Sequence, residues 1–452
     1  MNKPISGAAR LTMPGGELLH GDVWDRILIA AIFGGMLALA YLPFGTNLLD
    51  PILQAVDIGA WGTLATQPTV LWLSMGMLLL FVRTVLWLRY RPLAANANAR
   101  VPHLTVIIPA FNEGRMVERS IHSVAQADYP RDRLEIIVVD DGSRDNTWFY
   151  MRRAAECYPQ LVHAVRFESN RGKRAALAEG FRRARGEVVV TVDSDSIIER
   201  GTLRAMVAPF ENAIVGAVAG KVAVLNRRDG LLPRMLHVRF VLSFDFLRSA
   251  QSTFGTVYCC PGALAAYRTS VVHRVLERWE NQTFLGARCT IGEDRALTNS
   301  ILELGYDSVY QRNAVVHTVV PETYAKLCKM YLRWTRSFLR EEIRFARIVW
   351  KRKPLKMTAA VIETTITNLR YPVAYISIAL WMARAAHDPH AIARMLFAIG
   401  IASAFYMLYY LRSERSWDFV FGVLYSYFSI VALSWILPYA ALTLRARSWL
   451  TR

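Results

Sequence analysis

The stretch Val188–Ser196 reads VVVTVDSDS, an apolar and largely β-branched run that ends in Asp193 and Asp195, one residue apart. Such a run predicts a buried strand. Its acidic end would then lie at the carboxyl edge of a sheet, where open α/β folds bind their ligands. Two carboxylates at this spacing suit Mg²⁺ or Mn²⁺, which keeps several waters and bridges substrate phosphates. The alternative for the DSD sequence is an ordinary surface turn.

Two similar runs precede this one in the chain. Leu104–Pro109 reads LTVIIP and Glu135–Asp140 reads EIIVVD, and both have the composition of short buried strands. Polar stretches with helical patterns lie between the runs, such as Met116–Ala127 and Lys173–Ala184. Strands that alternate with helices predict a mainly parallel sheet with both faces covered. Residues 101–345 are therefore expected to form a Rossmann-like α/β domain.

Long apolar segments flank this domain on both sides. Ile27–Phe44 and Thr69–Leu88 each approach the roughly 20 apolar residues that a membrane-spanning helix needs. Three more follow the domain, Thr358–Met382, Ile392–Leu411 and Phe419–Leu442. A proline in the last makes it either a span or a re-entrant segment. The expected domains are an N-terminal cytoplasmic arm (1–26), two transmembrane helices (27–92), the α/β domain ending in interfacial helices (101–345), and a C-terminal region of two or three spans (346–452).

Charge and cysteine usage narrow the class of protein. The formal net charge is +18, and clusters of Lys and Arg stand beside apolar segments, as at Arg89 and Arg91. This placement favours anionic lipid headgroups and a cytoplasmic α/β domain over nucleic-acid binding. The five cysteines include no CxxC pair, which argues against a disulfide framework or a zinc site.

Polar residues interrupt the apolar segments. Arg83 is expected to extend to the headgroups, with a pore-lining position as the alternative. Glu363, Asn368 and Arg370 would be costly facing lipid, so we expect them to line a polar path or to lie at the interface.

Polar groups also follow the first two predicted strands. The segments Pro109–Glu113 (PAFNE) and Asp140–Ser143 (DDGS) offer carboxylates that can accept hydrogen bonds from a uracil imide or ribose hydroxyls. Gly142 would let the backbone approach closely. The DDGS sequence could instead form an Asx turn that caps the next helix. A basic turn, Asn170–Arg174 (NRGKR), opens a helix and suits a diphosphate through Lys173 and backbone N–H groups, or is simply a solvated turn.

Two groups lie farther along the chain. Gly292-Glu293-Asp294 precedes a helix-like stretch, so its acids suit either a general base for an acceptor hydroxyl or an N-cap worth about 1 kcal/mol. Lys329–Glu342 mixes aromatic and basic residues at helical spacing. Its face of Tyr331, Trp334 and Phe338 suits the membrane interface. Arg333 and Trp334 could instead extend into the site, the first to a phosphate and the second to a sugar face.

The series DDGS, DSD, GED and RW, in this order between apolar segments, resembles the processive family 2 glycosyltransferases, and hyaluronan synthases and rhizobial chitin-oligosaccharide synthases most closely. The resemblance extends from about residue 104 to the C-terminus, and Ser426–Arg452 is similar to the end of a hyaluronan synthase. The stretches that carry it are Asn170–Ala175, Phe254–Gly262 with Tyr267 and Arg268, Asn281–Gly286 and Ile291–Asn299.

The resemblance implies a GT-A-type α/β domain and an inverting, metal-dependent hexosyltransferase. The acceptor hydroxyl would displace UDP directly, without a covalent enzyme intermediate. The implied roles are uridine binding by Ala110, Glu113 and Asp141, diphosphate binding by Lys173 and Asp193, a Mg²⁺ or Mn²⁺ site at Asp193 and Asp195, catalysis by Asp294 beside Glu293, acceptor binding by Cys260, Pro261 and Gly262, and closure over UDP and acceptor by Arg333 and Trp334.

One position departs from the family pattern. The family has Gln-x-x-Arg-Trp, and here Met330 replaces the glutamine. A thioether neither donates nor accepts hydrogen bonds well, so the departure bears on how the acceptor is held and on processivity.

The function expected is synthesis of a β-linked polysaccharide at the bacterial inner membrane. The donor would be UDP-N-acetylglucosamine, alone or alternating with UDP-glucuronate, and the chain would cross the membrane. The expected partners are the UDP-sugar, the growing polysaccharide and membrane lipids. The alternatives are a non-processive transferase that adds one sugar to a lipid, a glucan synthase that uses UDP-glucose, and a transporter with a regulatory soluble domain.

Overall fold

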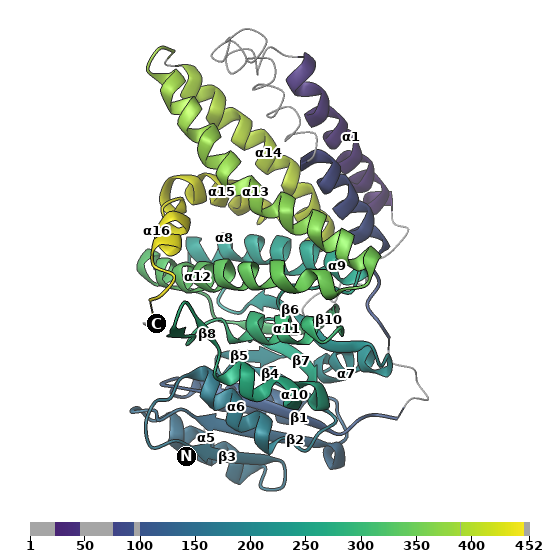
Figure 1. Cartoon of the computed structure of the whole chain (residues 1–452), viewed down its shortest axis with the longest axis vertical. Helices are drawn as coiled ribbons and strands as arrows, with labels where there is room; N and C mark the ends of the chain where they lie inside the picture. The colour runs from purple at the N-terminus through teal and green to yellow at the C-terminus, as the bar shows by residue number, and fades with distance from the viewer. Residues whose placement is uncertain (1–22, 46–75, 95–99, 389, 447–452) are drawn as a thin grey trace, which may run out of the picture.

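The computed structural model describes residues 23–45, 76–94, 100–388 and 390–446. A helical region lies at one end of the long axis and an α/β domain at the other, with a layer of helices between them (Figure 1). The N-terminal arm over residues 1–22 and the tail over residues 447–452 lie outside the described residues.

The α/β domain is built on an eight-stranded sheet in the order β3-β2-β1-β4-β7-β6-β10-β5. The pairs β2/β3, β1/β2, β1/β4 and β6/β10 are parallel, as expected, whereas β7 runs antiparallel to both β4 and β6, and β5 antiparallel to β10. The strands are β1 (Leu104–Ala110), β2 (Leu134–Asp140), β3 (Val162–Arg166), β4 (Val188–Val192), β5 (Ser196–Ile198), β6 (Val215–Val224), β7 (Leu264–Arg268) and β10 (Asp307–Thr318).

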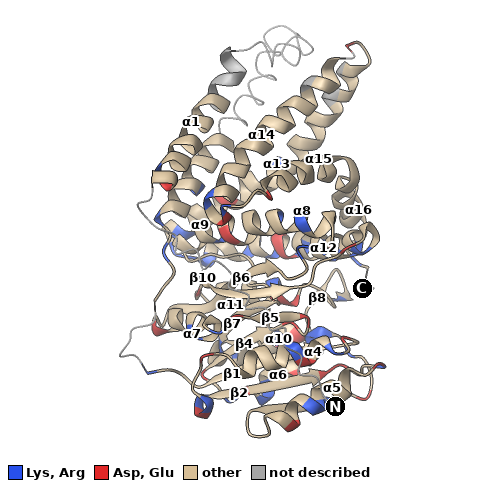
Figure 2. Cartoon of the chain, turned by 180° about the vertical axis from the view of Figure 1, so that it is seen from behind, with Lys and Arg blue, Asp and Glu red and all other residues tan. Residues whose placement is uncertain are grey.

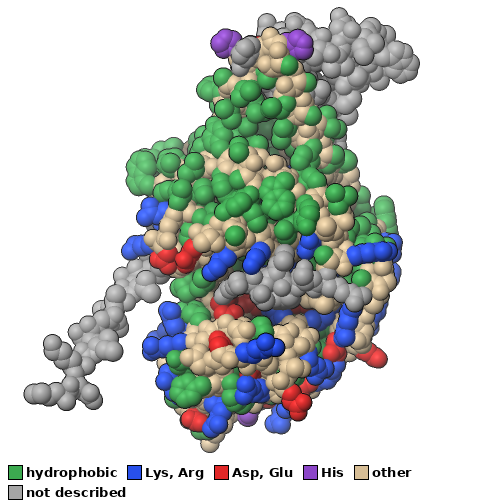
Figure 3. Space-filling view, turned by 90° about the vertical axis from the view of Figure 1, so that its left-hand side faces the viewer, with side chains coloured by type: hydrophobic (Ala, Val, Ile, Leu, Met, Phe, Trp, Pro, Cys, Tyr) green, Lys and Arg blue, Asp and Glu red, His purple; other side chains and the backbone are tan. Residues whose placement is uncertain are grey.

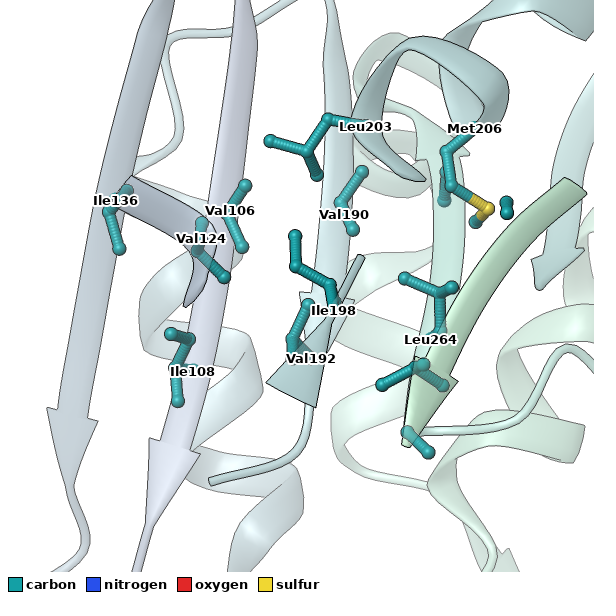
Figure 4. Close-up of a cluster of buried hydrophobic side chains, with 14 of the residues drawn as sticks. Val106, Ile108, Val124, Ile136, Val190, Val192, Ile198, Leu203, Met206 and Leu264 are labelled. Carbon is teal, nitrogen blue, oxygen red and sulfur yellow. The ribbon is translucent and has the colours of Figure 1, made fainter. Parts of the chain in front are cut away.

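Alternate residues of the central strands enter two separate cores. Val106 and Ile108 of β1 pack on one face of the sheet with Val190 of β4, while Ile107 and Val189 pack on the other. Figure 4 shows the first core, in which Val124, Leu203 and Met206 cover the strands. This alternation follows from the period-two geometry of a strand, and because both faces are covered, every position of β1 and β4 is buried.

Helices cover the two faces. The first face is covered by α4 (Met116–Ala125), α5 (Thr147–Cys157) and α7 (Thr202–Val207), and the second by α6 (Lys173–Arg183), α10 (Thr269–Glu280) and α11 (Glu293–Glu303). A two-stranded hairpin of β8 (Thr283–Phe284) and β9 (Ala287–Arg288) precedes α11. The helices expected over 116–127 and 173–184 are α4 and α6.

A helical layer separates the sheet from the helical region (Figure 1). It consists of α8 (Leu231–Phe240), a π-helical turn (Val241–Phe246), α9 (Leu247–Thr253) and α12 (Tyr324–Ile348). The side chain of Thr323 caps α12 by accepting a hydrogen bond from the N–H of Lys326. The helix expected over 329–342 is therefore the middle of α12.

The apolar segments also form helices. Those described are α1 (Val23–Gly45), a helix over residues 76–89, α13 (Pro354–Ala385), α14 (His390–Glu414), α15 (Phe419–Leu433) and α16 (Ile436–Leu442). Among the described residues, α14 is long and apolar enough to cross a membrane, and α15 with α16, bent by 43°, would make a second crossing or a re-entrant loop. The first part of the segment predicted over 69–88 lies outside the described residues. Apolar side chains cover much of the helical end, whereas most charged side chains lie in the α/β domain and in the layer between (Figures 2 and 3).

The expectation that Arg83 extends to lipid headgroups is wrong. Its Nη2 lies 2.7 Å from Oε1 of Glu363 in α13 and donates to Oγ1 of Thr367 at 2.6 Å. The two charged side chains are 12% and 8% exposed. Asn368 is likewise bound within the protein, to Glu342 of α12, whereas Arg370 is exposed. A charge inside apolar helices is costly unless it is paired, which explains why these polar groups of α13 face other helices.

The junction of α11 and α12 depends on a glycine. Gly292, just before α11, has φ +74°, and a Cβ built there would lie 1.7 Å from Oγ and 2.5 Å from Cβ of Ser337 in α12. Gly286, in the β8–β9 turn, has φ +77° with nothing within 4 Å of such a Cβ. The two positions share backbone strain and differ in the space around them.

We expect Gly292→Ala to destabilise the protein more than Gly286→Ala. Left-handed strain costs about 1–2 kcal/mol in each variant, and overlap with Ser337 adds about 1–3 kcal/mol in Gly292→Ala alone. Denaturant unfolding of the protein in detergent measures both losses. Equal losses would show that α11 and α12 are not packed this closely.

Candidate active site

A cavity of about 480 Å³ lies between the sheet and α12. The ends of β4 and β10 and the starts of α6 and α11 meet the side of α12 there. The predicted site residues that line it are Lys173, Asp193, Asp195, Pro261, Gly262, Glu293, Asp294, Arg333 and Trp334.

Asp193 and Asp195 occupy the connection between β4 and β5. The DSD sequence does form a turn, in which the N–H of Ser196 donates to the carbonyl oxygen of Asp193. It is not an ordinary surface turn, because Asp195 is buried and both acids line the cavity. Oδ1 of Asp195 accepts hydrogen bonds from Ser196 and from Oγ1 of Thr318, at 3.1 and 3.3 Å.

These two acids fit a divalent cation that is shared with a substrate. Carboxylate oxygens are the hard donors that Mg²⁺ and Mn²⁺ prefer. In the described part of the chain, however, no group of three or more His, Cys, Asp or Glu side chains is arranged around a metal position. An ion held by Asp193 and Asp195 would need further ligands, which water and a bound phosphate can supply.

Lys173 connects two of the acidic segments. It is the first residue of α6, and its Nζ lies 2.5 Å from Oδ1 of Asp193 and 3.4 Å from Oε1 of Glu293. Burial on its own would lower the pKa of Lys173, but the two carboxylates outweigh burial and raise that pKa above its usual value. The ammonium group therefore stays charged inside the cavity.

Glu293 and Asp294 are the first two residues of α11, and Gly292 occupies the N-cap position. The N-cap alternative for Asp294 is therefore wrong. Burial and the charge of Glu293 raise the pKa of Asp294. Burial also opposes ionisation of Glu293, but Lys173 and a backbone hydrogen bond outweigh it and lower the pKa of Glu293. Of the two acids, Asp294 is the one suited to accept a proton.

Each oxygen of the Asp294 carboxylate has a neighbour that orients it. Its Oδ1 accepts a hydrogen bond from the N–H of Arg295 at 2.7 Å, and its Oδ2 lies 3.5 Å from the thiol of Cys259. Burial raises the pKa of Cys259, so the sulfur keeps its proton and can donate it to the carboxylate. Sequence reasoning missed Cys259, because a thiol beside Cys260 carries no motif of its own.

The predicted uridine residues lie together outside the residues that line the cavity. Ala110 and Asp141 are adjacent at the ends of β1 and β2, where the N–H of Asp141 donates to the carbonyl oxygen of Ala110 at 2.9 Å. The Asp141 carboxylate accepts hydrogen bonds from the N–H groups of Arg171 and Gly172, at 2.7 and 2.8 Å. Burial raises its pKa. Glu113 lies in the loop after β1, where its N–H donates to Thr147.

Gly142 has the role expected of it. Its φ is +72°, and a Cβ there would lie 2.6 Å from the backbone carbon of Ser169. The segment after β2 and the basic turn before α6 are therefore packed backbone against backbone. The Asx-type alternative is also partly correct, because Oδ1 of Asp140 accepts a hydrogen bond from the N–H of Ser143 at 2.9 Å.

The segment before β7 forms another wall. Pro261 and Gly262 line the cavity, and a Cβ at Gly262 would lie 2.9 Å from Nζ of Lys173. Cys260 is buried behind them, and its N–H donates to Oγ1 of Thr298 in α11. Arg248 of α9, which sequence reasoning also missed, lines the cavity with its guanidinium 4.0 Å from the ring centre of Phe244.

α12 presents its aromatic residues to the cavity. Trp334 and Phe338 line the cavity instead of facing away from it, which agrees with the alternative that Trp334 extends into the site. Tyr331 faces another helix, where its hydroxyl lies 2.7 Å from that of Tyr425 in α15. Arg333 and Met330 also line the cavity, so the departure from the family pattern falls within the site itself.

Comparisons with known proteins show to which family the chain belongs. The model of the family described as "Glycosyl transferase family 2" matches residues 105–276. The chain is 30% identical over 392 residues to an N-acetylglucosaminyltransferase of Azorhizobium caulinodans, an alignment that covers 86% of this chain and 98% of the relative. It is 37% identical over 264 residues to a hyaluronan synthase of Streptococcus pyogenes serotype M3, covering 56% of this chain and 61% of the relative.

The fold is similar to that of a solved mannosyltransferase from Pyrobaculum calidifontis in complex with GDP-Man and Mn²⁺. The TM-score is 0.57 at 24% identity, with 90% of this chain and 98% of that chain covered. The GT-A-type fold expected for the α/β domain is confirmed. The chain belongs to glycosyl transferase family 2, and it is a glycosyltransferase similar to N-acetylglucosaminyltransferases and hyaluronan synthases.

Proposed function

We propose that the protein is an inverting, membrane-embedded transferase that polymerises a β-linked polysaccharide from UDP-sugars and passes it across the membrane. One observation carries the proposal: a single cavity holds Asp294, with its raised pKa, the acid pair Asp193 and Asp195, and the aromatic ring of Trp334. A base, a place for a diphosphate and a surface for a sugar ring are the parts that such a transfer needs.

The donor would lie along the carboxyl edge of the sheet. Ala110, Glu113 and Asp141 would hold the uridine, since each Asp141 oxygen that accepts a backbone N–H keeps a second lone pair for the uracil imide. Lys173 would contact the diphosphate, and Asp193 and Asp195 would hold Mg²⁺ or Mn²⁺ against it. When bound, that ion neutralises the charge of the departing UDP.

Transfer would be a single displacement. As the acceptor oxygen bonds to the anomeric carbon, the bond from that carbon to the diphosphate oxygen breaks, and Asp294 takes the hydroxyl proton. Attack from the face opposite UDP inverts the anomeric centre, so no covalent enzyme intermediate forms. Glu293 would remain ionised beside Lys173 and keep that ammonium in place.

The acceptor would lie on the α12 side of the cavity. Pro261 and Gly262 would contact it, with Cys260 behind them, and Arg333 and Trp334 would close over UDP and the terminal sugar. Because α12 lies between the α/β domain and the helical region, a chain that leaves along Trp334 and Phe338 moves toward the apolar helices (Figure 1). The basic residues beside those helices support a cytoplasmic site on the inner membrane.

Similarity to an N-acetylglucosaminyltransferase over nearly its whole length supports UDP-N-acetylglucosamine as the donor. Similarity to a hyaluronan synthase supports UDP-glucuronate as an alternating second donor. Met330 favours one other candidate, a non-processive transferase that adds a single sugar to a lipid. A thioether in the cavity wall offers the acceptor no strong hydrogen bond.

We expect Asp294→Asn to bind UDP normally and to lose sugar transfer by a factor of about 10² to 10⁴, because an amide cannot accept the proton. Asp195→Asn should instead lose metal-dependent UDP binding. UDP release and calorimetric binding of UDP separate the two effects in purified protein with Mn²⁺. Asp128→Asn, an exposed partner of Arg204 at the surface, is the matched control. Normal transfer by Asp294→Asn would remove the base assignment.

The pH dependence of transfer should reflect the same acid. Since burial and Glu293 raise the pKa of Asp294, the rate should fall on acidification at a pH above the usual aspartate value of about 3.9. Glu293→Gln removes the neighbouring negative charge, lowers the pKa of Asp294 and should move this acid limb to lower pH. Rate profiles of the two proteins test the sign, and an unmoved or raised limb would contradict it.

A further inference from the structure

The residue that follows the base is held by its side chain. The N–H of Arg295 fixes Oδ1 of Asp294 at 2.7 Å, so the orientation of this peptide sets that of the carboxylate. The guanidinium group of Arg295 lies 4.6 Å from the ring centre of Phe338 and forms an ion pair with Glu342. The Arg295 side chain is only 10% exposed. The peptide that orients the base is therefore anchored to α12.

Glu342 is engaged on both of its oxygens. Its Oε1 binds Arg295 of α11, and its Oε2 accepts a hydrogen bond from Nδ2 of Asn368 in α13 at 2.9 Å. A carboxylate with a charge-assisted bond on one oxygen and an amide bond on the other has little freedom to turn. The Asn368 contact thus restricts the Glu342 carboxylate, which in turn holds Arg295.

This contact is not what holds α11 to α12. The neighbouring Glu341 is fully buried, accepts hydrogen bonds from Gln282 and Asn299, and pairs with Arg344. Gly292 adds a close approach to Ser337. The two helices keep these contacts without Glu342, whereas the Arg295 guanidinium depends on it for its ion pair.

From this geometry we propose that Glu342 is a positioning residue for the base Asp294, acting through Arg295, with Asn368 of α13 supporting it. The inference rests on the proposed function. Arg295 lines the cavity together with Glu293 and Asp294. Without the carboxylate of Glu342, the guanidinium of Arg295 would move toward Glu293 and Asp294. That movement would turn the 294–295 peptide, and the guanidinium would then bind the Asp294 oxygen that must take the proton. The donor contacts at Lys173 and Asp193 lie on other elements and would not change.

The test is a comparison of Glu342→Gln with the unaltered protein in lipid nanodiscs, with UDP-N-acetylglucosamine and Mn²⁺. We expect kcat for UDP release to fall about 10- to 100-fold, because a base displaced by up to about 1 Å loses that much activity. KM for the donor should stay within about twofold of its original value. Glu342→Asp, which keeps the charge on a shorter side chain, should recover part of kcat.

Glu303→Gln is the matched control. It makes the same change on α11, at an acid that pairs with Arg278, Arg344 and Lys351 away from the cavity. It should keep the kcat of the unaltered protein. If Glu342→Gln does not fold, Asn368→Leu removes the amide that donates to Glu342, leaves the Glu342 carboxylate in place, and should lower kcat in the same way but less.

Failure of the positioning role and failure of the proposed function give different results. A kcat of Glu342→Gln equal to that of Glu303→Gln would overturn the positioning role, and so would a loss that appears in KM instead. An unaltered protein that releases no UDP from any UDP-sugar would overturn the proposed function instead.

Discussion

The ammonium of Lys173 makes the site possible, because it lies between two carboxylates that the fold brings into one cavity. Asp193, Asp195, Glu293 and Asp294 all line a space of about 480 Å³, where unpaired like charges would raise one another's pKa and oppose folding. Lys173 forms ion pairs with Asp193 and Glu293. Its charge helps to lower the pKa of Glu293. Asp294 forms no ion pair of this kind within the described part of the chain, and its pKa is the one that is raised. Lys173 thus neutralises Asp193 and Glu293 and leaves Asp294 as the acid suited to accept a proton.

The rest of the architecture brings these charges together. The parallel half of the sheet places the start of α6 beside the end of β4, so Lys173 meets Asp193. The antiparallel strand β7 then brings Pro261 and Gly262 to the same end of β4. The glycine at position 262 leaves room for the ion pair, because a Cβ there would lie 2.9 Å from Nζ of Lys173 and 3.4 Å from Oδ1 of Asp193. α11 and α12 close the remaining side, with Gly292 packed against Ser337.

The sequence was sufficient to predict the elements whose pattern is local. The strands that end at Asp140 and just before Asp193 were predicted to within a residue. A β-branched apolar run that ends in an acid rarely forms anything other than a buried strand. The orientation of β7 was not predictable, since antiparallel pairing depends on a partner chosen by the whole sheet. Arg83 was misplaced for a related reason. Its partner Glu363 lies 280 residues away in the sequence, and no local sequence pattern predicts an ion pair between residues so far apart.

The most direct test of this account is UDP release and product size from the purified protein in lipid with Mg²⁺ or Mn²⁺. It is given UDP-N-acetylglucosamine alone and then together with UDP-glucuronate. The account predicts metal-dependent UDP release and a polymeric product, sensitive to chitinase if the first donor suffices and to hyaluronidase if both are required. The absence of UDP release under both conditions would contradict it.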